Sequence, residues 1–161
     1  MLDSDRMNLR IRLEQDTVSA LRVQDVASIP PTGTVAEAVA LMQERRAGCV
    51  VVTEHDRPVG IFTERDLLTR VLADSVAMDA SIAEVMSSPT KVVQESCSIA
   101  EVIHIMHRGG FRHLPVVDGS GDLRGIISVK CIVEALVEHF PAAVFNLPPE
   151  PQQKQLAREG A

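Results

Sequence analysis

Aromatic residues are scarce in this sequence, which has no Trp, no Tyr and only four Phe among 161 residues. The hydrophobic core must therefore be built from Val, Ile, Leu, Met and Ala, and a site for a planar ligand has few rings to stack against it. Clustered positive charge is also lacking, since the formal net charge is −6 at pH 7. Affinity for a polyphosphate backbone depends on clustered Lys and Arg, so this charge argues against a general nucleic-acid binder.

Paired cysteines and long apolar runs are missing as well. The three cysteines, Cys49, Cys97 and Cys131, are odd in number and show no C-x-x-C spacing. The N-terminus lacks the basic start and apolar stretch of a signal peptide, and no run approaches the roughly 18 apolar residues of a membrane span. The five histidines show no metal-ligand spacing. These absences predict a reduced, cytoplasmic, soluble protein without a metal site.

The chain contains an internal repeat. The segment TVAEAVALM, which begins at Thr34, returns in register as SIAEVIHIM at Ser98. The offset between the copies grows by one at Gly60 and Gly125, because the turn before the second glycine is one residue longer. Each copy has only about 60 residues, which is marginal for a stable core alone. We therefore expect the two copies to pack against each other about a pseudo-twofold axis.

Each copy has the same predicted order of elements. Thr34 and Ser98 each have a Glu three residues later, a capping box that begins a helix. An apolar strand, a turn-rich hairpin, a second strand and a second helix from Thr63 or Ser128 follow. The predicted fold class is α/β (α+β), with small sheets flanked by helices.

The predicted organisation has four parts. Residues 1–22 form an N-terminal segment, residues 23–78 the first repeat and residues 79–140 the second. Residues 141–161 form a tail rich in Pro and polar residues, which we expect to be mobile. The apolar stripes of the two second helices are wider than one interface needs, so we expect part of that surface to face another subunit.

The repeated motifs resemble those of a known family. The pattern VQDV or IAEVM, then a capped helix, then RHLPVVD and GIFTERD, is similar to a tandem pair of cystathionine beta-synthase (CBS) domains over residues 23–139. This resemblance implies one flat module with two clefts, which pairs with a second module into a disk-like homodimer. It also implies that the clefts bind adenosine-containing ligands such as AMP, ADP, ATP or S-adenosylmethionine. Such modules act as sensors for an attached or partner protein.

The segment TERD at residues 63–66 allows two interpretations. A Thr followed three residues later by Asp is an ordinary helix cap, in which the hydroxyl accepts an amide hydrogen and the acid favours the positive end of the helix. The same carboxylate can instead accept hydrogen bonds from a ribose diol, while the amides and Thr63 face phosphate. In the CBS family the matching Asp and hydroxyl hold ribose and phosphate, so the resemblance favours the second interpretation for Thr63 and Asp66.

The second copy has a thiol where the first has the acid. Cys131 stands at the position of Asp66, and a thiol cannot accept paired hydrogen bonds from a diol as a carboxylate does. Hydrogen bonds to charged groups contribute about 1.5 to 3 kcal/mol, so binding should weaken by roughly 10- to 150-fold. We expect the cleft of Thr63 and Asp66 to be the principal site and the cleft of Ser128 and Cys131 to be weak or empty.

The motif GGFRHLPVV adds three candidates at the start of the second copy's strand. Arg112 and His113 are either solvated residues at a strand end or donors to phosphate. We assume that both lie near the central axis and can reach either ligand. Phe111 is a candidate neighbour of adenine, although a Phe before a strand is more often a core residue.

The remaining candidates have weaker support from the sequence. Arg65 and Lys130 lie within the two hydroxyl motifs, where they either face phosphate or belong to a plain helix surface. Ile61 and Val92 are more often core residues, but the family's adenine pocket uses apolar residues at these positions. The full set of candidate binding residues is Ile61, Thr63, Arg65, Asp66, Val92, Phe111, Arg112, His113, Ser128 and Lys130.

These observations predict a homodimeric regulatory sensor that binds an adenine nucleotide between its repeats and passes a change of shape to a protein partner. No nucleophile with a paired base is visible in the sequence, so we expect no catalytic activity. The alternative is a ligand-independent module for dimerisation or protein interaction. The missing acid at Cys131 slightly favours that alternative, and the complete GIFTERD motif opposes it.

Overall fold

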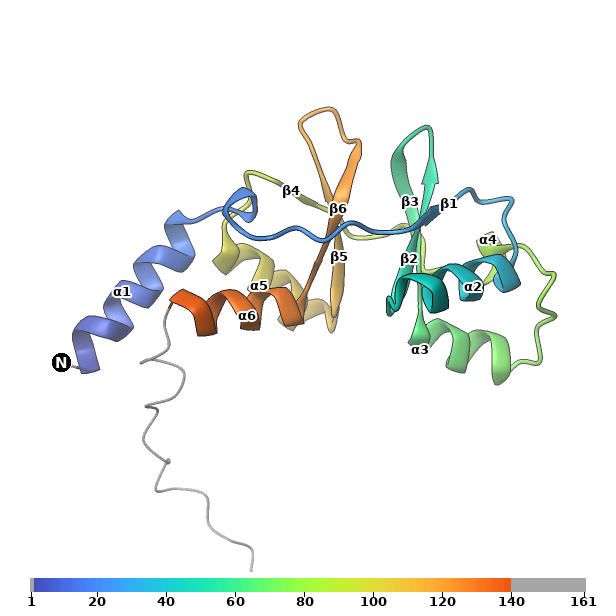
Figure 1. The fold of residues 1–161 in the computed structure, drawn as a ribbon, viewed down its shortest axis with the longest axis horizontal. Coiled ribbons are helices and arrows are strands. Elements are labelled where there is room, and N and C mark those ends of the chain that lie inside the picture. Colours follow the sequence, from blue (N-terminus) through green and yellow to red (C-terminus); the bar gives the residue numbers. More distant parts are fainter. Residues whose placement is uncertain (1, 140–161) are drawn as a thin grey trace, which may run out of the picture.

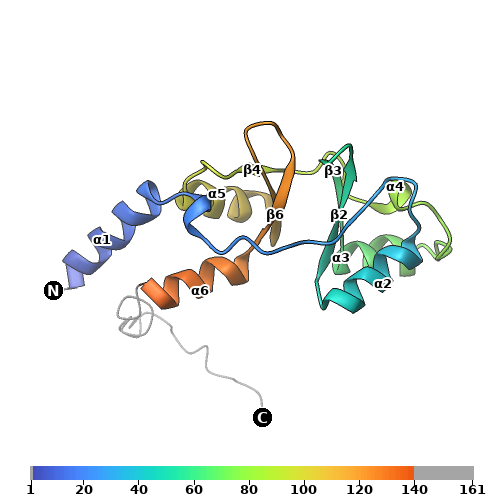
Figure 2. The same ribbon diagram turned by 45° about the horizontal axis from the view of Figure 1, so that its top comes forward.

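The computed structural model describes residues 2–139, and the predicted tail at residues 141–161 lies outside the described residues. Helices and two small three-stranded sheets make up the fold, which confirms the predicted α/β class. The two sheets stand next to each other at the centre of the molecule, and the helices flank their outer sides (Figure 1). The same arrangement is visible after a turn of 45° (Figure 2).

The first sheet combines one leading strand with the hairpin of the first repeat. The elements of this half are β1 (Ser28–Ile29), α2 (Val35–Arg45), β2 (Cys49–Glu54), β3 (Arg57–Thr63), α3 (Glu64–Asp66) and the π-helical segment η2 (Leu67–Leu72). Strand β1 pairs parallel with β2, and β2 pairs antiparallel with β3, with Val51 opposite Ile61.

The second half repeats this plan. Its elements are α4 (Ile82–Val85), β4 (Val93–Gln94), α5 (Ile99–Gly109), β5 (His113–Val117), β6 (Leu123–Ser128) and α6 (Val129–His139), and α1 (Leu2–Gln15) and η1 (Val18–Ala20) precede both repeats. Strand β4 pairs parallel with β5, and β5 pairs antiparallel with β6. The hairpin register shifts after Val52 in the first half and after Val116 in the second. These two positions are equivalent in the repeat, so even the irregularity is repeated.

The predicted capping residues begin the helices. The hydroxyl of Thr34 accepts a hydrogen bond from the amide of Glu37 (3.2 Å), and the Glu37 carboxylate accepts one from the amide of Thr34 (2.8 Å). The hydroxyl of Ser98 likewise accepts a hydrogen bond from the amide of Glu101 (3.2 Å). The two predicted helix starts are confirmed.

The second helix of the first repeat is less regular than the sequence suggests. The amide of Ala73 donates to the carbonyl of Leu68, five residues earlier (3.2 Å), which is the π-helical pattern. The hydroxyl of Thr69 donates to the carbonyl of Arg65 (2.8 Å), the acceptor that the Thr69 amide would use in an α-helix. The side-chain bond therefore competes with the regular backbone pattern in this segment.

The leading segment of each repeat crosses to the other half. The amide of Val18 donates to the carbonyl of Cys97 (2.9 Å), and at the equivalent position of the second copy the amide of Ile82 donates to the carbonyl of Gly33 (2.8 Å). Val18 lies in the hydrophobic core of the second half, whereas Ile82 and Val85 lie in that of the first. The two halves are therefore interlocked, with equivalent bonds on the two sides of a pseudo-twofold axis.

A third group of buried apolar residues joins the two sheets at the centre of the molecule. It contains Cys49, Val51 and Ile61 from the first half and Ile126 from the second. This packing fixes how the ends of the two sheets lie relative to each other, and the cleft described below forms there. Within residues 2–139, no helix is long and apolar enough to cross a bilayer.

Candidate functional site

A cleft of about 560 Å³ opens where the two halves meet. The end of β3, the short α3 and the start of η2 form its wall in the first half. The connection between α5 and β5 forms the opposite wall, and the segment 87–91 before β4 supplies the third side. Figure 1 shows α3 and the α5–β5 connection at the same edge of the two sheets.

Thr63 and Asp66 form a complete capping box at the base of this cleft. The Oδ2 atom of Asp66 accepts hydrogen bonds from the amide of Thr63 (2.9 Å) and from its hydroxyl (2.7 Å). The Thr63 hydroxyl in turn accepts a bond from the amide of Asp66 (3.3 Å). Asp66 is only 5% exposed although it carries a charged side chain. The helix-cap interpretation of TERD is therefore realised in the fold.

The other carboxylate oxygen of Asp66 is held by residues outside the motif. The hydroxyl of Ser87 donates to Oδ1 (3.2 Å), and Nε of Arg70 lies 3.4 Å from the same atom. Arg70 also donates through Nη1 to the carbonyls of Val85 (3.2 Å) and Met86 (2.7 Å). A carboxylate offers about four acceptor positions, and three of those on Asp66 accept hydrogen bonds, two from Thr63 and one from Ser87, while Arg70 forms an ion pair.

The opposite wall presents an aromatic ring and an imidazole. Phe111 is 41% exposed, and its ring lies where a Cβ on Gly109 would be, so a larger residue at that position would displace it. A Cβ added to Gly48 would lie 3.5 Å from the His113 ring and 3.6 Å from a carboxylate oxygen of Glu64. Burial lowers the pKa of His113 below its ordinary value, although the negative charge of Glu64 acts in the opposite direction.

The cleft brings most of the candidate residues together. Arg112 and His113 come from the second half and line the same cleft as Thr63 and Asp66. The further expectation, that both also reach a ligand in the cleft of Ser128 and Cys131, stays a prediction. Seven of the ten candidates line this cleft, namely Ile61, Thr63, Arg65, Asp66, Phe111, Arg112 and His113.

Three candidates, Val92, Ser128 and Lys130, do not line this cleft. Ser128 is buried, and its hydroxyl accepts a hydrogen bond from the amide of Cys131 (3.2 Å) and contacts the thiol at the same distance. The ammonium group of Lys130 lies 3.6 Å from the carboxylate of Glu134 on an exposed face of α6. Ser128 thus caps α6 as Thr63 caps α3, but the third residue after it is Cys131 instead of an acid.

Sequence reasoning missed six polar residues of the cleft, namely Glu64, Thr69, Arg70, Ser87, Thr90 and Lys91. A signal existed for Arg70, because a residue four positions after Asp66 lies on the same face of a helix. Ser87 is 21 residues from Asp66 and reaches it only because the leading segment of the second repeat crosses to the first half. No local pattern carries that information.

The sequence model of the CBS domain matches residues 18–73 and 82–138 of this chain. The chain belongs to the CBS domain family. It is 36% identical over 132 residues to an uncharacterised protein of Methanopyrus kandleri, a match that covers 81% of this chain and 66% of that one. The chain spans only about a quarter of the length of related CBS domain-containing proteins of Arabidopsis thaliana.

Two solved CBS structures share this fold. A CBS domain-containing protein of Agrobacterium tumefaciens is 33% identical, with a TM-score of 0.65 over 74% of this chain and 97% of that one. A CBS domain protein of Pyrobaculum aerophilum, solved in complex with AMP, is 26% identical, with a TM-score of 0.69 over 82% of this chain and 98% of that one. The predicted CBS pair is therefore confirmed, and the matches support a regulatory module.

Proposed function

We propose that the chain is a non-catalytic sensor module that binds an adenosine-containing ligand, with AMP, ADP, ATP and S-adenosylmethionine as candidates. The observation that carries this proposal is the meeting of two groups in one cleft. The acid of Asp66 comes from the first repeat, and Arg112 and His113 come from the second. Binding would therefore bridge the halves, and a ligand that prefers one arrangement of the halves would shift the population toward it.

The lining of the cleft suits the parts of such a ligand. Its volume of about 560 Å³ falls within the range of roughly 300 to 1,000 Å³ that is usual for small-molecule sites. Asp66 offers acceptors for ribose hydroxyls, and the guanidinium of Arg112 matches phosphate oxygens. The exposed ring of Phe111 and the side chain of Ile61 supply apolar contacts for adenine. The related Pyrobaculum protein, which was solved with AMP, supports this ligand class.

One site per chain is the expected stoichiometry. Cys131 stands where the second cleft would need an acid, and its thiol already contacts the Ser128 hydroxyl (3.2 Å). A diol bound there would lack the charge-assisted hydrogen bonds that Asp66 offers. We therefore place the principal site at Thr63 and Asp66.

A second candidate function is a ligand-independent dimerisation module. It is favoured by the internal pairing of both carboxylate oxygens of Asp66, which have partners within the protein when no ligand is bound. It is also favoured by exposed apolar side chains on the two second helices, Leu68 and Leu72 on η2 and Val129 and Val133 on α6. A homodimer through this face is compatible with either function.

Calorimetry and thermal unfolding with AMP, ADP, ATP, NAD and S-adenosylmethionine separate the two functions. We expect at least one of these compounds to stabilise the wild type, by about 2.7 kcal/mol at a concentration of 100 times Kd. Asp66→Asn should weaken its binding by roughly 10- to 150-fold, because the neutral amide lacks the charge-assisted bonds. Stabilisation by none of the compounds would leave the dimerisation module as the function.

Glu37→Gln is the matched control for this experiment. Glu37 is the third residue of another helix and closes the capping box of Thr34, as Asp66 closes that of Thr63, but it does not line the cleft. The control removes the charge from a similar capping box, as Asp66→Asn does, and should keep full ligand affinity. Equal loss of affinity in both variants, or two equally tight sites per chain, would contradict the proposed site.

A further inference from the structure

The crossing segment at residues 82–91, which contains α4 and leads to β4, is tied to the carboxylate of Asp66. Ser87 in this segment donates directly to Oδ1 (3.2 Å). Arg70 lies 3.4 Å from the same oxygen and binds the carbonyls of Val85 and Met86, so it connects the acid to the segment a second time. Three consecutive residues, Val85, Met86 and Ser87, are therefore linked to one carboxylate oxygen, two of them through Arg70.

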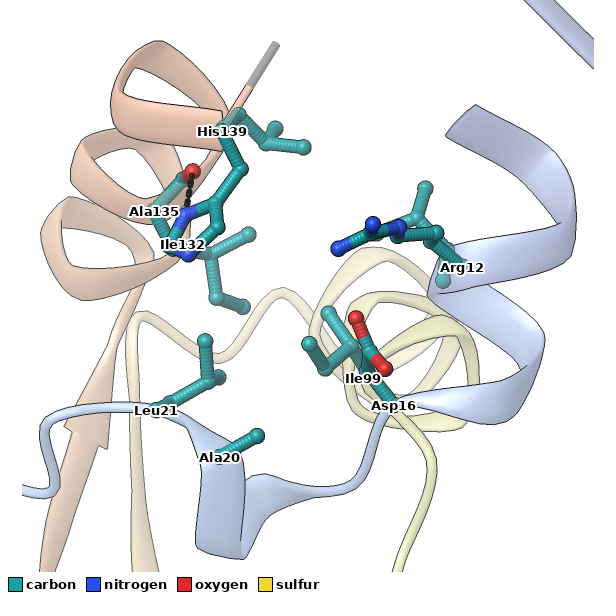
Figure 3. A pocket seen from close by; sticks show the side chains of 10 residues that line it. Arg12, Asp16, Ala20, Leu21, Ile99, Ile132, Ala135 and His139 are labelled. Atoms are coloured by element: carbon teal, nitrogen blue, oxygen red, sulfur yellow. Dashed lines mark hydrogen bonds between the residues drawn. The ribbon is translucent and has the colours of Figure 1, made fainter. Parts of the chain in front are cut away.

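The second half has none of the three side chains that form this network. At the equivalent positions of the repeat, Cys131 replaces Asp66, Ala135 replaces Arg70 and Val23 replaces Ser87. Figure 3 shows Ala135 and Leu21, the counterpart of Val85, in the lining of the same cavity of about 50 Å³. A small residue thus stands where the first half has the arginine that reaches the carbonyl of Val85.

The second half therefore forms the same elements without this network. Both halves have the cap, the crossing segment and the sheet pairing, but only the half with the acid has the arginine and the serine. Since all three side chains line the cleft, this comparison favours a role for them in the cleft. Their common feature is that two donors from the protein occupy Oδ1, the oxygen of Asp66 that the capping box leaves open.

We infer that Ser87 and Arg70 compete with ligand hydroxyls for Oδ1 of Asp66, so that binding of a ribose diol releases the side-chain ties of residues 85–87. This inference rests on the proposed ribose contact of Asp66. The backbone pair between Ile61 and Ser87, with bonds of 3.1 and 2.8 Å, remains in place. The released segment is the route by which occupancy of the cleft reaches the second half, since residues 85–87 lead to β4.

If Ser87 competes with the ligand, its removal should change the ligand affinity in the opposite direction from the removal of a residue that contacts the ligand. By linkage, a group that the ligand must displace lowers the ligand's affinity, and its removal raises that affinity. Ser87→Ala should therefore bind adenosine roughly two- to tenfold more tightly than the wild type, the range expected when one competing hydrogen bond is removed. A serine that contacts the ligand would give weaker binding instead.

Ser88→Ala is the matched control, because Ser88 is the next residue and its hydroxyl donates to the carbonyl of Val59 (3.0 Å) rather than to Asp66. Isothermal titration of both variants and the wild type should use adenosine and 2′,3′-dideoxyadenosine. We expect tighter binding only for adenosine and only in Ser87→Ala, because the dideoxy compound has no diol to compete for Oδ1. Unchanged or weaker adenosine binding in Ser87→Ala overturns the inference.

Hydrogen exchange of the crossing segment gives a second, independent measurement. Adenosine should speed amide exchange in residues 82–88 of the wild type, although a bound ligand usually slows exchange nearby. Arg70→Gln should show faster exchange there without ligand and little further increase with adenosine. Slower exchange in the wild type with adenosine would overturn the inference while leaving the proposed function intact. Failure of every adenosine compound to bind the wild type would end both.

Discussion

At the scale of single residues, the contrast between the two hydroxyl motifs separates structure from function. Thr63 and Ser128 each accept a hydrogen bond from the amide three residues later, at 3.3 and 3.2 Å. The cap therefore forms with Asp66 in one half and with Cys131 in the other. A nearly buried carboxylate carries a desolvation cost that the thiol avoids. The acid is thus unnecessary for the local fold, which favours a binding role.

His113 gives a prediction for the pH dependence of stability. Burial lowers its pKa in the folded protein below the ordinary value of 6.5, the charge of Glu64 opposes this shift, and that of Arg112 adds to it. His113 therefore takes up its proton at a higher pH in the unfolded chain than in the folded chain. Its contribution to the free energy of unfolding is fully present above pH 6.5 and is lost as the pH drops below that value. Urea unfolding across this range should show the decline.

The variant His113→Gln tests this assignment. It removes the titrating group, so its midpoint of unfolding should depend less on pH than that of the wild type. His104→Gln, which changes an exposed imidazole on α5, should keep the wild-type pH dependence. An identical decline in wild type and His113→Gln would assign the pH dependence to other groups.

At the scale of the elements, two glycines mark where the crossing segments pass over the hairpins. Gly60 and Gly125 are equivalent, and each lies under the crossing segment of the opposite repeat. A Cβ at Gly125 would be 2.5 Å from the backbone carbonyl oxygen of Gln24, whereas a Cβ at Gly60 would meet the side chain of Met86. Close approach of the backbone explains why Gly125 carries no side chain, whereas at Gly60 the side chain of Met86 takes up the space.

The two glycines should respond differently to substitution. Gly125→Ala forces a shift of the backbone at Gln24, so we expect it to lower the free energy of unfolding by about 1 to 3 kcal/mol. Gly60→Ala requires only that the flexible side chain of Met86 move, and it should cost about 1 kcal/mol or less. Chemical denaturation of both variants measures the difference. Equal costs would mean that the crossing segments do not press on the two hairpins as described.

Elements that depend on local chemistry were predictable from the sequence. The hydroxyl and Glu pairs at Thr34 and Ser98 mark helix starts, because a cap forms within one turn of the chain. The hairpins follow from apolar runs on both sides of a turn-rich segment. The π-helical course of η2 was not predictable, since the competing bond of the Thr69 hydroxyl leaves no distinctive mark in an apolar helix.

At the scale of the whole molecule, the repeat revealed the two halves but not how they interlock. Self-similarity says that Val18 and Ile82 are equivalent, and it is silent on which core each of them enters. The crossing brings Ser87 to Asp66, and for this reason no sequence pattern pointed to the serine or to Lys91 in the cleft. The cleft residues that belong to the repeated motifs, such as Thr63 and Arg65, were predictable.

The exposed apolar face of the second helices leads to the last prediction, which concerns assembly. Leu68 and Leu72 on η2 are 61% and 60% exposed, and Val129 and Val133 on α6 are also exposed. Full burial of a Leu or Val side chain contributes about 1.5 to 3 kcal/mol, so covering this face with a second copy would be strongly favourable. We expect light scattering to give a mass twice that of a single chain for the wild type.

Charges placed on this face should separate the copies. The double variant Leu72→Glu, Val133→Glu puts a carboxylate on each of the two helices without touching the cleft lining, and its mass should fall to that of one chain. Met78→Glu is the control, because Met78 is a similarly exposed apolar side chain in the connection after η2. It should remain dimeric. A monomeric wild type would contradict the expected dimer, and a double variant that stays dimeric would place the dimer interface on another surface. Adenosine binding that persists in the monomeric variant would show that one chain holds the complete site.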